Sequence, residues 1–83
     1  MRPVDPRADP AVIDLIELAG LWLAAGEWAS FCRTLARLEH EIAQRFPSHA
    51  EFLRRFRDLR ELTEGAQVDS EIVRKAYRRA TVG

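Results

Sequence analysis

Apolar residues recur every three or four positions along most of this chain, which is the period of an amphipathic α-helix. Two segments show the pattern clearly, one on each side of Pro47. The first stripe contains Trp28, Phe31, Leu35, Leu38, Ile42 and Phe46, and the second contains Phe52, Leu53, Phe56, Leu59 and Leu62. No useful run alternates between apolar and polar residues, so strands are not expected. The pattern predicts an all-α fold.

Capping signals place four helices. Asp9 and Pro10 are typical of a helix start and Gly26 of a helix end, which predicts a first helix over 10–25. The second helix should run from near Glu27 to about Phe46. Ser48 and Glu51 have the spacing of a capping box, so the third helix is expected from there to Glu64, closed by Gly65. Asp69 should cap a short fourth helix from Ser70 to about Ala80, with Val68 and Val73 clamping its entry.

Residues 1–8 precede the first cap and are expected to form a flexible leader to one helical domain over 9–83. The expected architecture is a small bundle of three main helices plus the short C-terminal one. The short turn at Pro47 should fold the second and third helices into an antiparallel hairpin. Facing residues should then have numbers that sum to about 97 or 98, as Phe46 with Phe52 and Ile42 with Phe56 do.

The first predicted helix is more apolar than a small bundle can cover. Its apolar residues occupy well over half of its circumference, and Leu21 lies between Asp14 and Glu17 on the face expected to meet water. Large exposed apolar patches usually mark interfaces. We therefore expect a protein-binding surface around the first helix and its junction with the second: Leu15, Leu18, Leu21, Trp22, Ala25 and Trp28. For the two tryptophans a role in the core is the favoured interpretation, and an anchor for a partner is the alternative.

Two charged residues fall inside apolar stripes. Glu39 lies beside Leu35 on the second helix, and Arg60 lies beside Phe56 on the third. Their numbers sum to 99, close to the register of the hairpin, which favours an interhelical salt bridge. The functional alternative is a polar site that recognises a ligand or partner.

The residues that carry most enzyme and metal chemistry are sparse. Cys32 is the single cysteine, and His40 and His49 do not form a metal-binding pair. The chain also lacks a glycine-rich phosphate loop and a nucleophile motif. We expect no enzyme activity, no cofactor and no metal, with Cys32 as a buried structural thiol and both histidines on the surface.

Charge and apolar content limit the partners further. Thirteen basic and thirteen acidic residues cancel, so the whole chain has no net charge that attracts nucleic acid or anionic membranes. The most apolar stretch, 11–26, contains two acids and is too short to cross a bilayer. A single cysteine and the absence of a signal-peptide pattern in the given sequence favour the cytoplasm.

The C-terminal segment is locally basic, with Arg74, Lys75, Arg78 and Arg79 around Tyr77. Together with the third helix it superficially matches a helix-turn-helix, so these four residues are candidate nucleic-acid contacts. The neutral chain and the lack of base-reading side chains argue against that use. Basic residues at a helix C-terminus also complement the helix dipole.

Residues 18–47 resemble one tetratricopeptide unit, with an aromatic in the first helix, Gly26 in the turn, Trp28 after it and Pro47 at the end. The chain departs from that pattern in the length of the second helix, in Phe31 where a small residue is usual, and in having one copy of a unit that needs neighbours. The resemblance implies a helical hairpin.

The leading functional prediction is an adaptor, accessory subunit or chaperone-like protein that binds another protein or a second copy of itself; a small DNA-binding regulator is the alternative.

Overall fold

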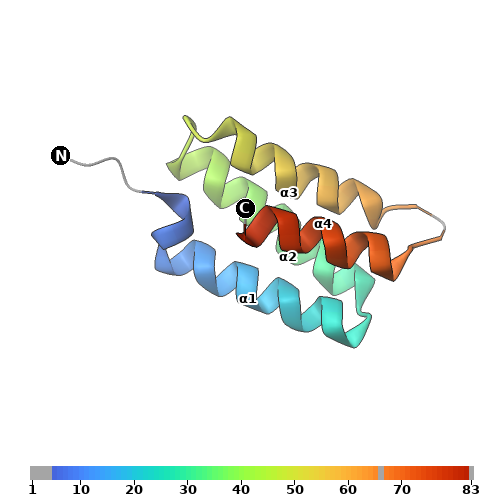
Figure 1. The fold of residues 1–83 in the computed structure, drawn as a ribbon. Coiled ribbons are helices and arrows are strands. Elements are labelled where there is room, and N and C mark those ends of the chain that lie inside the picture. Colours follow the sequence, from blue (N-terminus) through green and yellow to red (C-terminus); the bar gives the residue numbers. More distant parts are fainter. Residues whose placement is uncertain (1–4, 66, 83) are drawn as a thin grey trace.

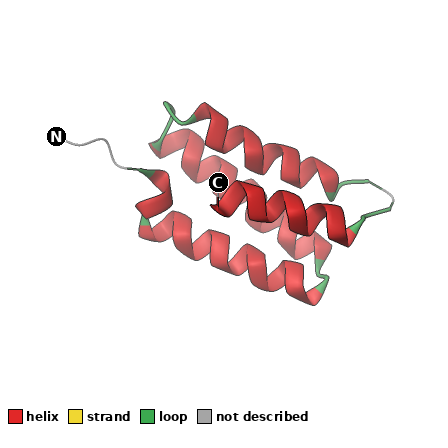
Figure 2. Ribbon diagram, viewed as in Figure 1, coloured by secondary structure: helices red, strands yellow, loops and turns green. Residues whose placement is uncertain are grey.

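The computed structural model describes residues 5–65 and 67–82, and this part of the chain is helical with no strand (Figures 1 and 2). The elements are a 3₁₀-helix η1 (Pro6–Ala8), α1 (Pro10–Ala25), α2 (Trp28–Arg45), α3 (Ala50–Leu62) and α4 (Ser70–Val82). Consecutive helices run in opposite directions, and α4 lies opposite α2 with α1 and α3 on either side (Figure 1). The predicted all-α bundle is confirmed, and its fourth helix is as long as its third, at 13 residues each.

The core is built on α2. Phe31, Leu35, Leu38 and Ile42 are fully buried, as the stripe on that helix predicts. The other helices each contribute apolar residues that close around this row: Val12, Ala19, Leu23, Phe52, Phe56, Leu59, Val73 and Ala80. Because α2 packs against both α1 and α3, its apolar stripe is not available to a partner molecule.

Three of the predicted helix ends are confirmed. The Asp9 carboxylate accepts a hydrogen bond from the Val12 N–H at 3.2 Å, which satisfies one of the free donors at the start of α1. Gly26 ends α1 with a φ of 72°, the left-handed conformation that glycine adopts without strain. Asp69 caps α4 by accepting from the N–H groups of Glu71 at 3.0 Å and Ile72 at 3.3 Å.

Both predicted ends of α3 are wrong. The turn after α2 closes when the His49 N–H donates to the Phe46 carbonyl at 3.0 Å, which puts His49 rather than Ser48 at the helix start. No side chain caps α3, so the Ser48–Glu51 box does not form. At the other end the helix stops at Leu62, and Gly26 is the one described residue with positive φ, so Gly65 is not a left-handed cap.

The structure also differs from the prediction at the start of the chain. Residues 1–4 of the expected leader lie outside the described residues, whereas residues 5–8 are held against the bundle. Asp5 accepts a hydrogen bond from the Arg7 N–H at 2.9 Å, Pro6 is buried, and the Arg7 guanidinium lies 5.2 Å from the centre of the Phe52 ring. This short segment therefore covers the junction between α1 and α3.

Helices α2 and α3 form the antiparallel hairpin that the register predicts. Two contacts between side chains set it: Glu39 with Arg60, and Cys32 with Thr63. The prediction misplaces only the last turn of α3. Leu62 is 41% exposed, and the neighbouring Thr63, 6% exposed, faces α2 in its place.

Candidate interaction surface

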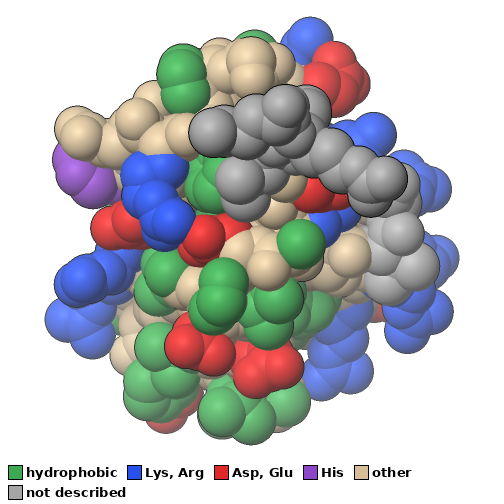
Figure 3. Space-filling view, turned by 90° about the vertical axis from the view of Figure 1, so that its left-hand side faces the viewer, with side chains coloured by type: hydrophobic (Ala, Val, Ile, Leu, Met, Phe, Trp, Pro, Cys, Tyr) green, Lys and Arg blue, Asp and Glu red, His purple; other side chains and the backbone are tan. Residues whose placement is uncertain are grey.

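Three large apolar side chains on the outer face of α1 are exposed to solvent. Leu21 is 68% exposed, Leu18 40% and Ile13 36%, although all three lie on a helix whose inner face is fully packed. Figure 3 views the bundle along its length, and hydrophobic side chains gather around acidic ones at the bottom, where α1 lies. The sequence-based expectation of excess apolar surface on this helix agrees with these exposures.

The other predicted interface residues lie in three different settings. Ala25 is exposed next to Leu21, and Leu15 and Trp22 are half-buried. Leu15, Leu18 and Trp22 line one hollow with Arg33 and Arg37 of α2. Trp28 is half-buried too, and it packs edge-on against the buried Phe31, with ring centres 6.1 Å apart.

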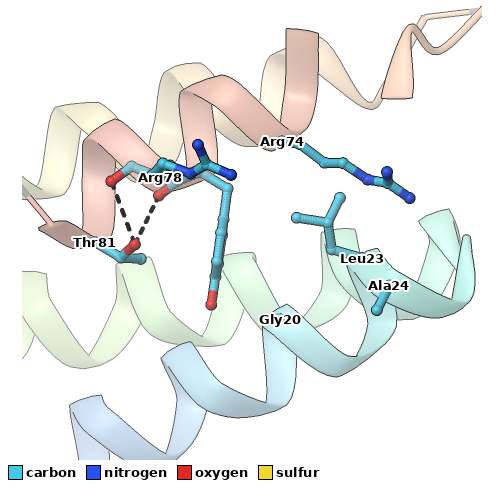
Figure 4. A pocket seen from close by; sticks show the side chains of 7 residues that line it. Gly20, Leu23, Ala24, Arg74, Arg78 and Thr81 are labelled. Carbon is cyan, nitrogen blue, oxygen red and sulfur yellow. Dashed lines mark hydrogen bonds between the residues drawn. The ribbon is translucent and has the colours of Figure 1, made fainter. Parts of the chain in front are cut away.

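A second hollow, of about 560 Å³, runs between α1 and α4 (Figure 4). Gly20, Leu23 and Ala24 form its α1 wall. The α4 wall consists of Arg74, Tyr77, Arg78 and Thr81. Figure 4 shows Arg74 reaching along the groove on the side of Leu23 and Ala24. The groove thus has one apolar wall and one cationic wall.

Tyr77 fixes α4 against α1. Its hydroxyl donates a hydrogen bond of 2.6 Å to the Ile16 carbonyl, and its ring lies 6.2 Å from that of Phe31. Burial, with a smaller effect of the negative charge on Glu17, raises the pKa of Tyr77. Gly20 allows this approach, because a Cβ at that position would lie 2.8 Å from the Tyr77 hydroxyl oxygen. No signal in the sequence pointed to this contact.

The four basic residues of α4 are all exposed, and none forms an ion pair with a described residue. Arg74 and Arg78 lie in the groove against α1. Arg79 lies on the other side of α4, in a hollow with Leu62 and Ala76. Helices α3 and α4 run side by side in opposite directions across a seven-residue connection (Figure 1). A helix-turn-helix instead crosses its helices at a steep angle over a shorter turn.

The structure brings Glu39 and Arg60 together in a forked ion pair. Arg60 donates through Nε to one carboxylate oxygen of Glu39 and through Nη2 to the other, and it also donates to Glu64 at 2.7 Å. Arg57 lies 3.6 Å from the same carboxylate. These contacts raise the pKa of Arg60, mainly through the hydrogen bond to Glu39. Every polar atom of the pair is satisfied within the protein, which favours a structural role over ligand recognition.

Cys32 extends this polar contact between α2 and α3. Its sulfur lies 2.5 Å from the Thr63 hydroxyl, and that hydroxyl donates its single proton to the Arg60 carbonyl at 2.7 Å. Cys32 is half-buried rather than fully buried, and its contact with Thr63 across the hairpin is in keeping with a structural role. His40 is exposed, and His49 packs edge-on against Phe46. Within residues 5–65 and 67–82, no group of side chains could hold a metal ion.

Sequence reasoning missed one partly buried ion pair, between Asp9 and Arg45. Asp9, 7% exposed, receives hydrogen bonds from both terminal nitrogens of Arg45, at 2.5 and 2.9 Å, in addition to capping α1. The bond from Arg45 is the main reason that the pKa of Asp9 is lowered. The signal existed: an antiparallel pairing of α1 and α2 about Gly26 places residues whose numbers sum to about 54 opposite each other, as Asp9 and Arg45 do.

No protein-family model, curated protein or solved structure matches this chain. The resemblance to a tetratricopeptide unit is therefore limited to the α1–α2 hairpin that it implied. No helix in the described part of the chain is long and apolar enough to cross a membrane.

Proposed function

We propose that this chain is a protein-interaction module, of the adaptor, accessory-subunit or chaperone-like kind, that binds through the outer face of α1. The observation that carries the proposal is the exposure of Leu21 in the middle of a helix that already buries Val12, Ala19 and Leu23 on its inner face. Burying a leucine from water stabilises a complex by roughly 1.5 to 3 kcal/mol. A helix that keeps this side chain in water gains that free energy only when a second molecule covers it.

The purified protein is proposed to associate with a second copy of itself through this face. Where a different partner protein is present, that protein takes the place of the second copy. Helix-in-groove contacts use apolar residues at helical spacing, and Leu18, Leu21 and Ala25 have that spacing on the exposed side of α1. A domain with so small a core also gains stability by association. The proposed compartment is the cytoplasm, in keeping with a single cysteine that has no partner in the chain.

The test substitutes Leu21→Asp and measures mass by light scattering, binding to proteins of the native host and helicity by circular dichroism. Ile72→Asp is the matched control, because Ile72 is 53% exposed on α4 and away from α1. We expect Leu21→Asp to abolish association with helicity retained, and Ile72→Asp to leave association unchanged. Association that survives Leu21→Asp would mean that α1 is only a core helix.

A second candidate function is nucleic-acid binding through α4, which the four basic side chains on that helix favour, because none of them forms an ion pair with a described residue. The antiparallel arrangement of α3 and α4 does not favour it, because neither helix projects from the bundle as a recognition helix does (Figure 1). We therefore rank it second.

A further inference from the structure

We propose that the α1–α4 groove binds α1 of a second copy of this chain, so that two chains form a symmetric dimer. This inference specifies the occupant of the surface proposed above and rests on that proposal. It assigns a role to two features of the monomer, which are the acidic residues on the outer face of α1 and the arginines beside it that form no ion pair within the described part of the chain.

The two helices that border the groove have opposite charge. Helix α1 contains Asp14 and Glu17 and no basic residue, whereas α4 contains four basic residues and one acid, Glu71. Arg74 and Arg78 line the groove and form no ion pair with any described residue. Each copy therefore carries both an acidic, apolar helix and a groove with a cationic wall. The neutral chain also has no net repulsion to overcome when two copies meet.

Helical spacing gives the contact a register. If α1 packs antiparallel to the α1 of the second copy about a point between Gly20 and Leu21, the numbers of facing residues sum to about 41. Glu17 of the second copy then lies opposite Ala24, at the end of the groove that Arg74 lines (Figure 4). Leu21 of the second copy then lies opposite Gly20, at the α1 wall of the groove, which Tyr77 also borders. By symmetry each dimer contains every contact twice.

The other side of α1 fits an acidic helix less well. The hollows on that side are lined by Arg33 and Arg37 of α2, but Asp14 and Glu41 lie in the same strip. Glu41 is already 3.8 Å from Arg45. This wall carries both signs of charge, so it attracts a second acidic helix less than the α4 wall does.

The experiment exchanges the charges and measures the dimer dissociation constant by sedimentation. Glu17→Arg alone and Arg74→Glu alone each place like charges opposite each other twice per dimer, and each should raise Kd about tenfold or more. A mixture of the two variants should form a heterodimer with nearly wild-type Kd, because both of its contacts then join opposite charges. Arg33→Glu, the same charge change on the α2 wall, is the control and should change Kd little.

The outcomes separate this inference from the proposed function. If Leu21→Asp dissociates the dimer but the charge variants and their mixture all behave as the wild type does, α1 is the interface and the groove is not its partner. If Arg33→Glu weakens the dimer as much as Arg74→Glu does, the second copy occupies the α2 side instead. A mixture that binds no tighter than either variant alone also overturns the register. Circular dichroism of each variant checks that the monomer is folded.

Discussion

Replacement of Gly20 by alanine tests how α4 is attached to the bundle. Alanine within a helix is more stable than glycine by about 1 kcal/mol, so the change should stabilise an ordinary helix. In this protein the added methyl group would lie 2.8 Å from the Tyr77 hydroxyl oxygen and 3.5 Å from the ring carbon that carries it. The first distance forces Tyr77 to move, whereas the second is an ordinary contact.

The movement should cost the hydrogen bond from Tyr77 to the Ile16 carbonyl, which contributes about 0.5 to 1.5 kcal/mol. We therefore expect Gly20→Ala to change stability by no more than about 0.5 kcal/mol in either direction in the wild-type background, because the helix gain and the lost contact offset each other. In a Tyr77→Phe background the close oxygen is gone, and the same change should stabilise by roughly 0.5 to 1 kcal/mol.

Urea unfolding of the four proteins, followed by circular dichroism, gives the coupling between the two positions. We predict that this coupling is on the order of 1 kcal/mol. If Gly20→Ala stabilises both backgrounds equally, Tyr77 does not lie over Gly20 and the groove between α1 and α4 is not formed as described.

Three further predictions concern charged residues. Glu39→Ala and Arg60→Ala should each destabilise the protein, and the double variant should lose about 1 kcal/mol less stability than the two single losses added together. The 29% exposure of the Arg60 side chain to solvent keeps this coupling small. Additive losses in urea unfolding would mean that the two side chains do not interact. The contacts that lower the pKa of Asp9 stabilise the fold at pH values above its ordinary pKa of 3.8, and this stabilisation is lost as the pH falls through the lowered pKa. Asp9→Asn should therefore be less stable than the wild type at neutral pH and should lose less stability on acidification. Acid unfolding profiles that are identical for the two proteins would contradict this. If α4 binds DNA, a mobility shift at low salt should weaken with added salt and with Arg74→Ala or Arg78→Ala, and no shift at low salt would exclude that function.

The sequence predicts those parts of the fold that depend on local signals. The stripes on α2 and α3, the caps at Asp9 and Asp69 and the turn at Gly26 each follow from residue type and spacing over a few positions. The predicted start of α3 is wrong, and the reason is also local. Serine and glutamate at the right spacing are compatible with a capping box, but the backbone turn after Phe46 decides which residue begins the helix.

Contacts between distant segments are predictable only where a register fixes them. The short turn at Pro47 restricts how α2 and α3 can pair, so Glu39 and Arg60 could be matched by number. The seven-residue connection before α4 imposes no such register, and the contact of Tyr77 with Gly20 and Ile16 was not predicted. The α1–α4 groove, with its cationic wall, follows from that contact and was missed with it.

The mass of the purified chain in solution, measured over a wide range of concentration for the wild type and for Leu21→Asp, tests the central claim most directly. We expect the wild type to approach twice the monomer mass as its concentration rises, and Leu21→Asp to remain a folded monomer throughout. A wild type and a variant with the same mass at every concentration would contradict it.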